Sequence, residues 1–256
     1  MSDVPLWDTF SADYDRFVDW EGRLAREMPF LEGVLRQSGA QRVLDVACGT
    51  GHHAIALQER GFEVVGADVS SGMVAEARRN AETRDAAVTF VQAGLGGLRG
   101  AAKGPFDAAL CLGNSLPSVL SEVALHDALA DISAVLAPDG TLFIQNLNYD
   151  RVWPRRERFM PLQTYRQGEE EWLFFRFVDF HQETLTFNMV VLHRNGRLWD
   201  YTAGATDLRP IFSEDLKRLL QQNGFEDVDL YGDYDQNPYR PDTGGDLIVV
   251  ARKNQP

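Results

Sequence analysis

Four residues in the first third of the chain have the types and spacing of a site for a nucleoside-containing cofactor. Gly49 and Gly51 would let backbone approach a ligand closely, and the helix that follows would present unpaired N–H groups to it. Asp68 follows Gly49 by nineteen residues, a spacing at which a carboxylate can accept hydrogen bonds from both ribose hydroxyls. Asp45 precedes the glycines by four residues, where it can meet an α-amino group.

Two cofactor classes are consistent with this arrangement of four residues. The run Gly49-Thr50-Gly51-His52-His53-Ala54 also satisfies the dinucleotide fingerprint G-x-G-x-x-A, so an NAD-dependent oxidoreductase is one alternative. An acid at position 45 suits the α-amino group of a bound amino acid, which a dinucleotide lacks. No Tyr/Lys or Cys/His pair for hydride transfer is evident downstream. These features favour a methyl donor built on methionine.

The elements that would position these residues alternate between strand and helix. Strands are expected at 43–47, 64–68, 88–92, 106–112, 142–147, 226–232 and 246–252. Helices are expected at 23–37, from the glycine turn to about residue 60, and at 71–82, 121–136 and 213–222. This alternation predicts an α/β fold: a doubly wound, seven-stranded and mainly parallel sheet with helices on both faces.

A second pattern interrupts the alternation after the fifth strand. Residues 171–194 alternate as an antiparallel hairpin that is rich in tryptophan and phenylalanine. We therefore expect a core formed by residues 1–150 and 209–256, with an N-terminal helical cap. Residues 151–208 form an antiparallel β insertion on the substrate side or at a subunit interface.

The motifs resemble those of a known family. Val43-Leu44-Asp45-Val46-Ala47-Cys48-Gly49-Thr50-Gly51 resembles the first motif of class I S-adenosylmethionine-dependent methyltransferases, and Ala67-Asp68-Val69-Ser70 resembles the second. Two further segments, Cys111-Leu112-Gly113-Asn114-Ser115 and Asn148-Tyr149-Asp150, are similar to the glycine/sarcosine N-methyltransferase family. The resemblance implies the Rossmann-like methyltransferase fold and S-adenosylmethionine as the cofactor.

The resemblance also implies roles for individual residues. Arg23 would hold the methionyl carboxylate, Asp68 the ribose, and Gly94 with Leu95 the adenine. The complete cofactor set is Tyr14, Arg23, Asp45, Ala47, Gly49, Gly51, Asp68, Val69, Met73, Gly94, Leu95 and Leu112. The expected substrate-binding residues are Asn114, Asn148 and Arg176.

One position departs from the family pattern. The family has His-Arg before the Asn-Tyr-Asp segment, and that arginine grips the substrate carboxylate, whereas this chain has Asn146-Leu147. Leucine offers no donor and cannot pair with a carboxylate. Either another arginine replaces it, with Arg176 and Arg209 as candidates, or the acceptor is a different amine or a hydroxyl compound. The ordinary alternative for Arg176 is a structural ion pair with Asp179, Glu171 or Glu183.

The acceptor chemistry is left open between nitrogen and oxygen. A neutral amine needs little more than a hydrogen-bond acceptor, whereas a hydroxyl needs a general base, and the chain contains five histidines. N-methylation of a small amine or amino-acid-like substrate is the leading hypothesis, and O-methylation of a small natural product is the enzyme alternative. A cofactor-binding protein without turnover is the non-enzyme alternative. No metal site is expected, because Cys48 and His52 supply only two ligands.

The overall composition restricts the partners. A net charge of −13 disfavours binding to a phosphate backbone, so the expected partner is a small molecule and not a nucleic acid. No apolar run approaches the ~18 residues of a membrane span. A cytoplasmic location and a possible homo-oligomer complete the expectations.

Overall fold

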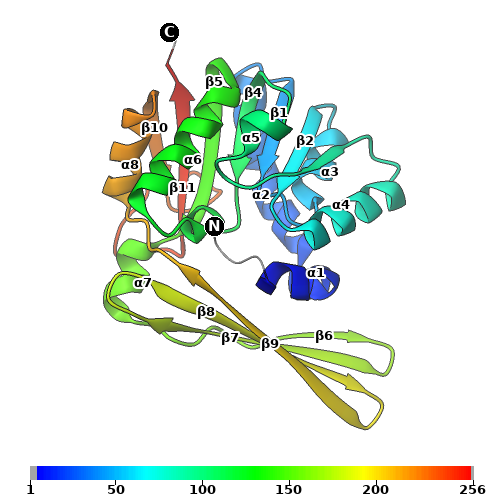
Figure 1. The fold of residues 1–256 in the computed structure, drawn as a ribbon. Helices are drawn as coiled ribbons and strands as arrows, with labels where there is room; N and C mark the ends of the chain where they lie inside the picture. The colour runs from blue at the N-terminus through cyan, green and yellow to red at the C-terminus, as the bar shows by residue number, and fades with distance from the viewer. Residues whose placement is uncertain (1–4, 255–256) are drawn as a thin grey trace.

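The core is a seven-stranded sheet in the order β10-β11-β5-β4-β1-β2-β3, seen in a computed structural model that describes residues 5–254 (Figure 1). Neighbouring strands from β5 to β3 run parallel, and β11 is antiparallel to both β5 and β10. The strands are β1 Arg42–Val46, β2 Glu63–Asp68, β3 Thr89–Gln92, β4 Phe106–Cys111, β5 Leu136–Leu147, β10 Phe225–Tyr231 and β11 Asp246–Lys253. The predicted doubly wound sheet is confirmed.

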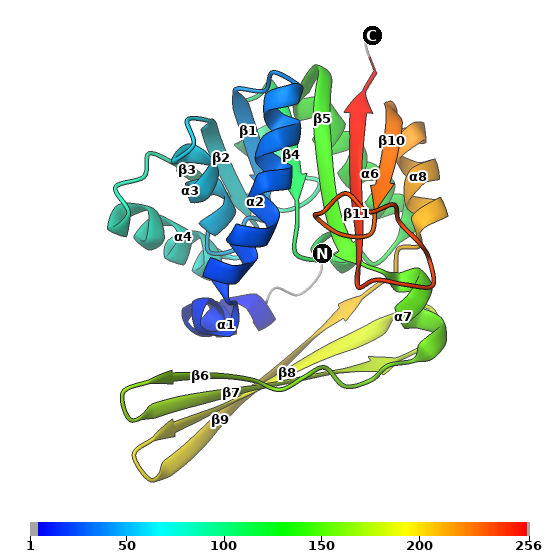
Figure 2. The same ribbon diagram turned by 180° about the vertical axis from the view of Figure 1, so that it is seen from behind.

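Two layers of helices cover this sheet, as the alternation requires. One face packs on α2 (Trp20–Gln37), α3 (His52–Gln58) and α4 (Ser71–Thr83) (Figure 2). The other face packs on α5 (Leu98–Ala101), α6 (Glu122–Val135) and α8 (Ser213–Gln222). The central strands β1 and β4 are buried from both sides, which explains their short, mostly apolar runs.

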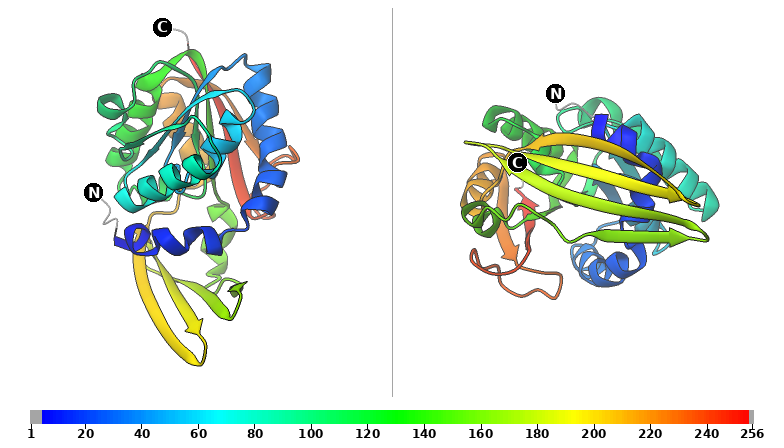
Figure 3. Two further views of the ribbon diagram at one scale, coloured as in Figure 1. Left: turned by 90° about the vertical axis from the view of Figure 1, so that its right-hand side faces the viewer. Right: turned by 90° about the horizontal axis from the view of Figure 1, so that it is seen from below.

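The insertion is a separate four-stranded antiparallel sheet in the order β6-β7-β8-β9. Helix α7 (Tyr149–Arg155) leads into β6 (Gln163–Gln167), β7 (Glu170–Phe180), β8 (Leu185–Asn195) and β9 (Leu198–Leu208). The sheet lies across the end of the core at which the parallel strands finish (Figures 1 and 3). The predicted hairpin is the β7–β8 pair, and the two outer strands were missed.

Helix α1 (Pro5–Phe17) lies between the core and the insertion (Figure 3). Leu6 and Phe10 are buried in one apolar cluster with Trp172, Phe174, Met189 and Val191 of the insertion. Gly204 of β9 makes the close approach possible, because a Cβ there would lie 2.8 Å from Leu6 and 3.0 Å from Phe10. Burying two such side chains stabilises this arrangement by roughly 2 kcal/mol each. The described residues contain no helix long and apolar enough to cross a membrane.

Candidate functional site

The ends of β1 and β4 mark the place where the strand order reverses. The chain leaves β1 toward β2 and β3 on one side and returns to β4 on the other. In open α/β sheets the crevice at such a point is where ligands bind. Two non-glycine residues there, Ala47 after β1 and Asn114 after β4, have positive φ angles of 57° and 60°. Backbone held in this sparsely populated region is typical of functional sites.

The glycine loop and Asp68 form one hydrogen-bonded unit. Gly49 N–H donates to Asp68 Oδ2 at 2.9 Å, and Ser70 N–H donates to Asp68 Oδ1 at 2.9 Å. Gly51 begins α3 with a φ of 81°, and a Cβ there would lie 2.7 Å from the ring of Phe90. Only glycine therefore fits at position 51. The unit places a carboxylate directly beside the loop backbone, as the spacing predicted.

Asp45 is a buried acid without a full set of partners. Its side chain is 2% exposed, and Oδ2 has no hydrogen-bond partner. Burial, together with the nearby charge of Asp68, raises the pKa of Asp45 to about 7. Burial also raises the pKa of Asp68 itself. Two desolvated carboxyl groups at one crevice are stabilised by a cationic ligand, because a positive charge compensates for the water they have lost.

Arg23 and Tyr14 reach this crevice from the N-terminal helices. A Cβ on Gly113 would lie 3.6 Å from an Arg23 terminal nitrogen, and a Cβ on Gly49 would lie 3.7 Å from the Tyr14 ring. Arg23 therefore approaches the end of β4, and Tyr14 covers the glycine loop. Both positions agree with the contacts expected for a cofactor that spans β1 and β4.

The expected adenine end lies beyond β2. Val69 is 45% exposed, and a Cβ on Gly94 would lie 3.1 Å from a Val69 methyl group, so the two residues adjoin. Leu95 packs partly against the core. Met73 is buried in the first turn of α4, where its N–H donates to Ser70 Oγ. The surface available to an adenine base here therefore consists of apolar side chains and backbone atoms.

The two expected substrate asparagines differ in the contacts they make. Asn114 Nδ2 donates to Tyr149 Oη at 3.0 Å, and its Oδ1 accepts the N–H of Leu147 at 3.0 Å, which leaves one acceptor site on Oδ1. Leu112, immediately before this loop, is buried in the core. Asn114 thus ties the end of β4 to the end of β5.

Asn148 is wholly buried, and both polar atoms of its side chain have partners within the protein. Nδ2 donates to the carbonyls of Arg240 and Thr243, and Oδ1 accepts from Arg151 N–H. Tyr239 Oη, with one proton to donate, lies 2.7 Å from Asn148 Oδ1 and 2.6 Å from Asp150 Oδ2. This side chain holds a loop in place and has no atom left for a ligand. The substrate contact expected for Asn148 therefore finds no support in the structure.

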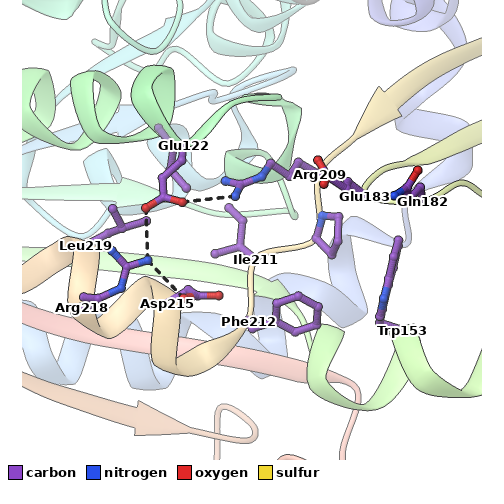
Figure 4. Close-up of a pocket in the computed structure, with 12 residues that line it drawn as sticks. Glu122, Trp153, Gln182, Glu183, Arg209, Ile211, Phe212, Asp215, Arg218 and Leu219 are labelled. Atoms are coloured by element: carbon purple, nitrogen blue, oxygen red, sulfur yellow. Dashed lines mark hydrogen bonds and ion pairs between the residues drawn. The ribbon is translucent and has the colours of Figure 1, made fainter.

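A cavity of about 290 Å³ lies away from these residues, between α6, α8 and the β7–β8 turn (Figure 4). Arg209 faces it and pairs with Glu122 at 3.6 Å, and Arg218 pairs with the same carboxylate at 3.2 Å. None of the expected cofactor residues lines this cavity. Arg209 is therefore a structural residue and does not replace the missing carboxylate-binding arginine.

Known proteins match both the sequence and this arrangement. The methyltransferase domain family matches residues 43–140. A glycine/sarcosine N-methyltransferase from Parasynechococcus marenigrum is 33% identical over 96% of this chain and 83% of its own length. The chain belongs to the glycine/sarcosine N-methyltransferase family. It is an S-adenosylmethionine-dependent methyltransferase, which excludes the nicotinamide alternative.

Solved structures agree with this methyltransferase fold. An S-adenosylmethionine-dependent methyltransferase from Clostridium acetobutylicum superposes with a TM-score of 0.79 at 16% identity, covering 98% of this chain and 100% of that one. An amino pentose methyltransferase from Micromonospora echinaspora, solved with S-adenosylmethionine bound, gives 0.73 at 20% identity, covering 96% and 97%. At these identities the likeness concerns the fold alone.

The residues of the methyltransferase crevice fit the charges of S-adenosylmethionine. The unpartnered Oδ2 of Asp45 suits the α-ammonium group, and Arg23 suits the carboxylate of the same methionyl end. Asp68 would hold the ribose beside the Gly49 backbone. The cofactor supplies a methyl group on a positively charged sulfur, so the protein needs to bind, align and exclude water.

Glu27, which the sequence did not single out, supports Arg23. Glu27 is buried and accepts from Arg23 Nε at 2.9 Å, while its other oxygen lies 2.8 Å from His53 Nε2. Burial would raise the pKa of Glu27, but the His53 hydrogen bond and the Arg23 charge outweigh it and lower the pKa to about 2. Glu27 therefore stays ionised and fixes one edge of the guanidinium. The spacing of four between Arg23 and Glu27 on a helix is the signal that could have revealed the pair.

We expect Glu27→Gln to weaken binding of S-adenosylhomocysteine about tenfold, because Arg23 loses the charge that orients it. Isothermal titration calorimetry measures this, and thermal unfolding monitors the accompanying loss of stability. Glu32→Gln is the matched control, since Glu32 lies on the same helix but pairs with Arg36 and Arg60 at the surface. Equal affinities for wild type and Glu27→Gln would contradict the orienting role.

Two aspartates of α1 attach that helix to the cofactor loops, and the sequence did not reveal them either. Asp15 accepts from Thr50 Oγ1 at 2.6 Å and from Asn80 Nδ2 at 2.8 Å, and lies 3.1 Å from His52. Asp8 accepts from Ser70 Oγ and Gly72 N–H at the start of α4. Their partners are 35 to 65 residues away in sequence, too far for a local pattern to indicate.

Proposed function

We propose that this methyltransferase transfers the methyl group of S-adenosylmethionine to the nitrogen of a small amine or amino-acid-like acceptor. In the reaction the S–CH3 bond breaks, an N–CH3 bond forms, and the nitrogen releases one proton. A neutral amine has its own lone pair and needs no strong base, whereas a hydroxyl acceptor does. The names of the similar proteins favour nitrogen, since they describe glycine and sarcosine as substrates of those enzymes.

The proposal that nitrogen, and not oxygen, accepts the methyl group rests on the positions of the five histidines. His52 stacks on Trp20 at 4.4 Å and lies beside Asp15, and His53 is bound to Glu27. The remaining three, His126, His181 and His193, are paired with Asp127, Thr186 and Glu170 on α6 and the insertion. Each of the five thus has a neighbouring partner, and none lies on β4, on β5 or in the loops that follow these strands. Those loops therefore supply no histidine that could take a proton from a hydroxyl acceptor.

The test compares acceptors that differ in one atom. Glycine and glycolate have the same carboxylate and the same size, but one offers an amine and the other a hydroxyl. We expect release of S-adenosylhomocysteine and a methylated product with glycine-like amines and none with glycolate, measured by mass spectrometry. Turnover of hydroxyl compounds without turnover of amines would overturn the proposal, and binding of S-adenosylhomocysteine by calorimetry shows that the protein tested is competent.

A further inference from the structure

Arg176 lies on the face of the insertion sheet that is turned toward the core. Its β7 neighbours on that face are Phe174, whose ring is 5.5 Å from Phe17 of α1, and Val178, which packs in one cluster with Leu147 and Tyr149. The Arg176 guanidinium carbon lies 4.8 Å from the centre of the Phe17 ring. Arg176 therefore lies between the helix that covers the cofactor loop and the residues that follow β5.

The connection from Arg176 to the glycine loop is short. The Phe17 ring is 6.0 Å from the Tyr14 ring, and Tyr14 lies over Gly49. On the other side, Tyr149 in the Val178 cluster accepts a hydrogen bond from Asn114. The guanidinium thus lies between contacts that lead to Tyr14 on one side and to Asn114 on the other.

Arg176 has no carboxylate within 4.0 Å among residues 5–254, although it is half-buried. Its Nε is buried without a partner, and its one side-chain hydrogen bond is a 3.4 Å contact to the carbonyl of Pro161. The other half-buried arginines of this part of the chain all have a carboxylate partner: Arg16, Arg23, Arg42, Arg151, Arg194 and Arg209.

Two of the three structural partners expected for Arg176 are bound elsewhere, and the third, Glu183, lies at the cavity between α6, α8 and the β7–β8 turn. Asp179 pairs with Arg158 at 2.6 Å on the opposite face of the sheet. Glu171 pairs with Arg166 and Arg194 at 2.6 and 2.9 Å. Removing a guanidinium from water without pairing it with an anion costs free energy. An unpaired charge of this kind suggests that the anion comes from a bound ligand.

We propose that Arg176 of the insertion supplies the guanidinium that binds an anionic group of the methyl acceptor. This inference rests on the proposed N-methylation and assigns the residue that would select acceptors with a carboxylate. The Leu147 side chain, at the end of β5, offers no donor, so the guanidinium is supplied by the insertion instead of the core. The planar guanidinium can hold a carboxylate through two parallel hydrogen bonds, which fixes the direction of the attached amine.

The kinetic test uses two variants and two acceptors. Arg176→Met keeps the length of the stem and removes the charge, and Arg158→Met removes a paired arginine from the other face of the same sheet. We expect Arg176→Met to raise KM for glycine at least 100-fold and to leave KM for glycinamide, which has no carboxylate, within about twofold. Arg158→Met should match wild type with both. An equal loss on both acceptors, or no loss on glycine, overturns the inference.

A binding experiment separates this inference from the proposed reaction. Methoxyacetate has a carboxylate but no amine, and calorimetry on the complex with S-adenosylhomocysteine measures its affinity without any turnover. We expect it to bind wild type and Arg158→Met, and to lose at least tenfold in affinity with Arg176→Met while S-adenosylhomocysteine binds equally to all three. Binding that is unchanged by Arg176→Met overturns the assignment of Arg176. Absence of amine turnover alone overturns the proposed reaction.

Discussion

Replacing Asp45 with asparagine is expected to stabilise the cofactor-free protein at pH 8 while weakening its binding of S-adenosylhomocysteine about 100-fold. The carboxyl is buried, and Oδ2 has no partner, so its charge lacks compensation until a cation arrives. Asparagine removes the unfavourable charge together with the attraction for the α-ammonium group. The same residue therefore lowers stability and supports binding.

The pH dependence of stability follows from the pKa of Asp45. In the unfolded chain the carboxyl loses its proton near its ordinary value of 3.8, and in the folded protein the pKa is about 7. Between these values folding takes up a proton, so the free energy of unfolding falls as pH rises, and the loss is complete above pH 7. Its size is on the order of 4 kcal/mol, because each pKa unit corresponds to about 1.4 kcal/mol. Chemical denaturation of wild type and Asp45→Asn at pH 5 and pH 8 measures the difference.

Cofactor binding should have the opposite pH dependence. The α-ammonium group requires the ionised carboxylate, so the affinity of wild type should fall about tenfold per pH unit below 7, and Asp45→Asn should lack this slope. Asp131→Asn is the control, because Asp131 is equally buried but accepts the N–H of Leu98 and pairs with Arg99. A wild-type affinity that is independent of pH from 5.5 to 8 would refute the pairing with the ammonium group.

Asp68→Ala is expected to weaken S-adenosylhomocysteine binding by about 100-fold or more, since two charge-assisted hydrogen bonds to the ribose are lost. The N–H of Gly49 also loses its acceptor, so the loop that carries the cofactor is less well ordered. Asp68→Asn keeps one acceptor oxygen and should bind with intermediate affinity. Calorimetry with both variants measures the series.

The control for Asp68 is Asp107, which also accepts backbone N–H groups but lies at the opposite end of the strands. Asp107 Oδ2 accepts the N–H groups of Gln41 and Arg42 at 2.9 and 2.8 Å. Asp107→Ala should therefore destabilise the fold by a similar mechanism and leave affinity for S-adenosylhomocysteine unchanged. If both alanine variants lose affinity equally, the effect of Asp68 is structural and its ribose role is wrong.

The core was predictable because its signals are local. Buried parallel strands leave short apolar runs, and the glycine turn fixes which strand is β1. The outer insertion strands were not predictable in this way. β6 is almost wholly polar, and β9 is exposed over most of its length, because both are edge strands and their alternation is weak.

The candidate site was predictable on the cofactor side and less so on the acceptor side. The alternation along β7 puts Arg176 on the face opposite Phe175 and Phe177, whose rings contact each other. The alternative of an ion pair with Asp179 or Glu171 was wrong, because Arg158, in the segment before β6, and Arg166 of β6 pair with those acids. Which arginine pairs with a given carboxylate depends on three-dimensional packing and cannot be predicted from the local sequence.

The position of α1 has a consequence for how strongly the two ligands bind together. The helix is bound to the cofactor loops through Asp8 and Asp15, and its Leu6 and Phe10 are buried against the insertion sheet that carries Arg176. An acceptor that holds the insertion against the core therefore also holds α1 over the cofactor. Because such coupling is reciprocal in binding free energy, a bound carboxylate should raise the affinity for S-adenosylhomocysteine by the same factor by which S-adenosylhomocysteine raises the affinity for the carboxylate.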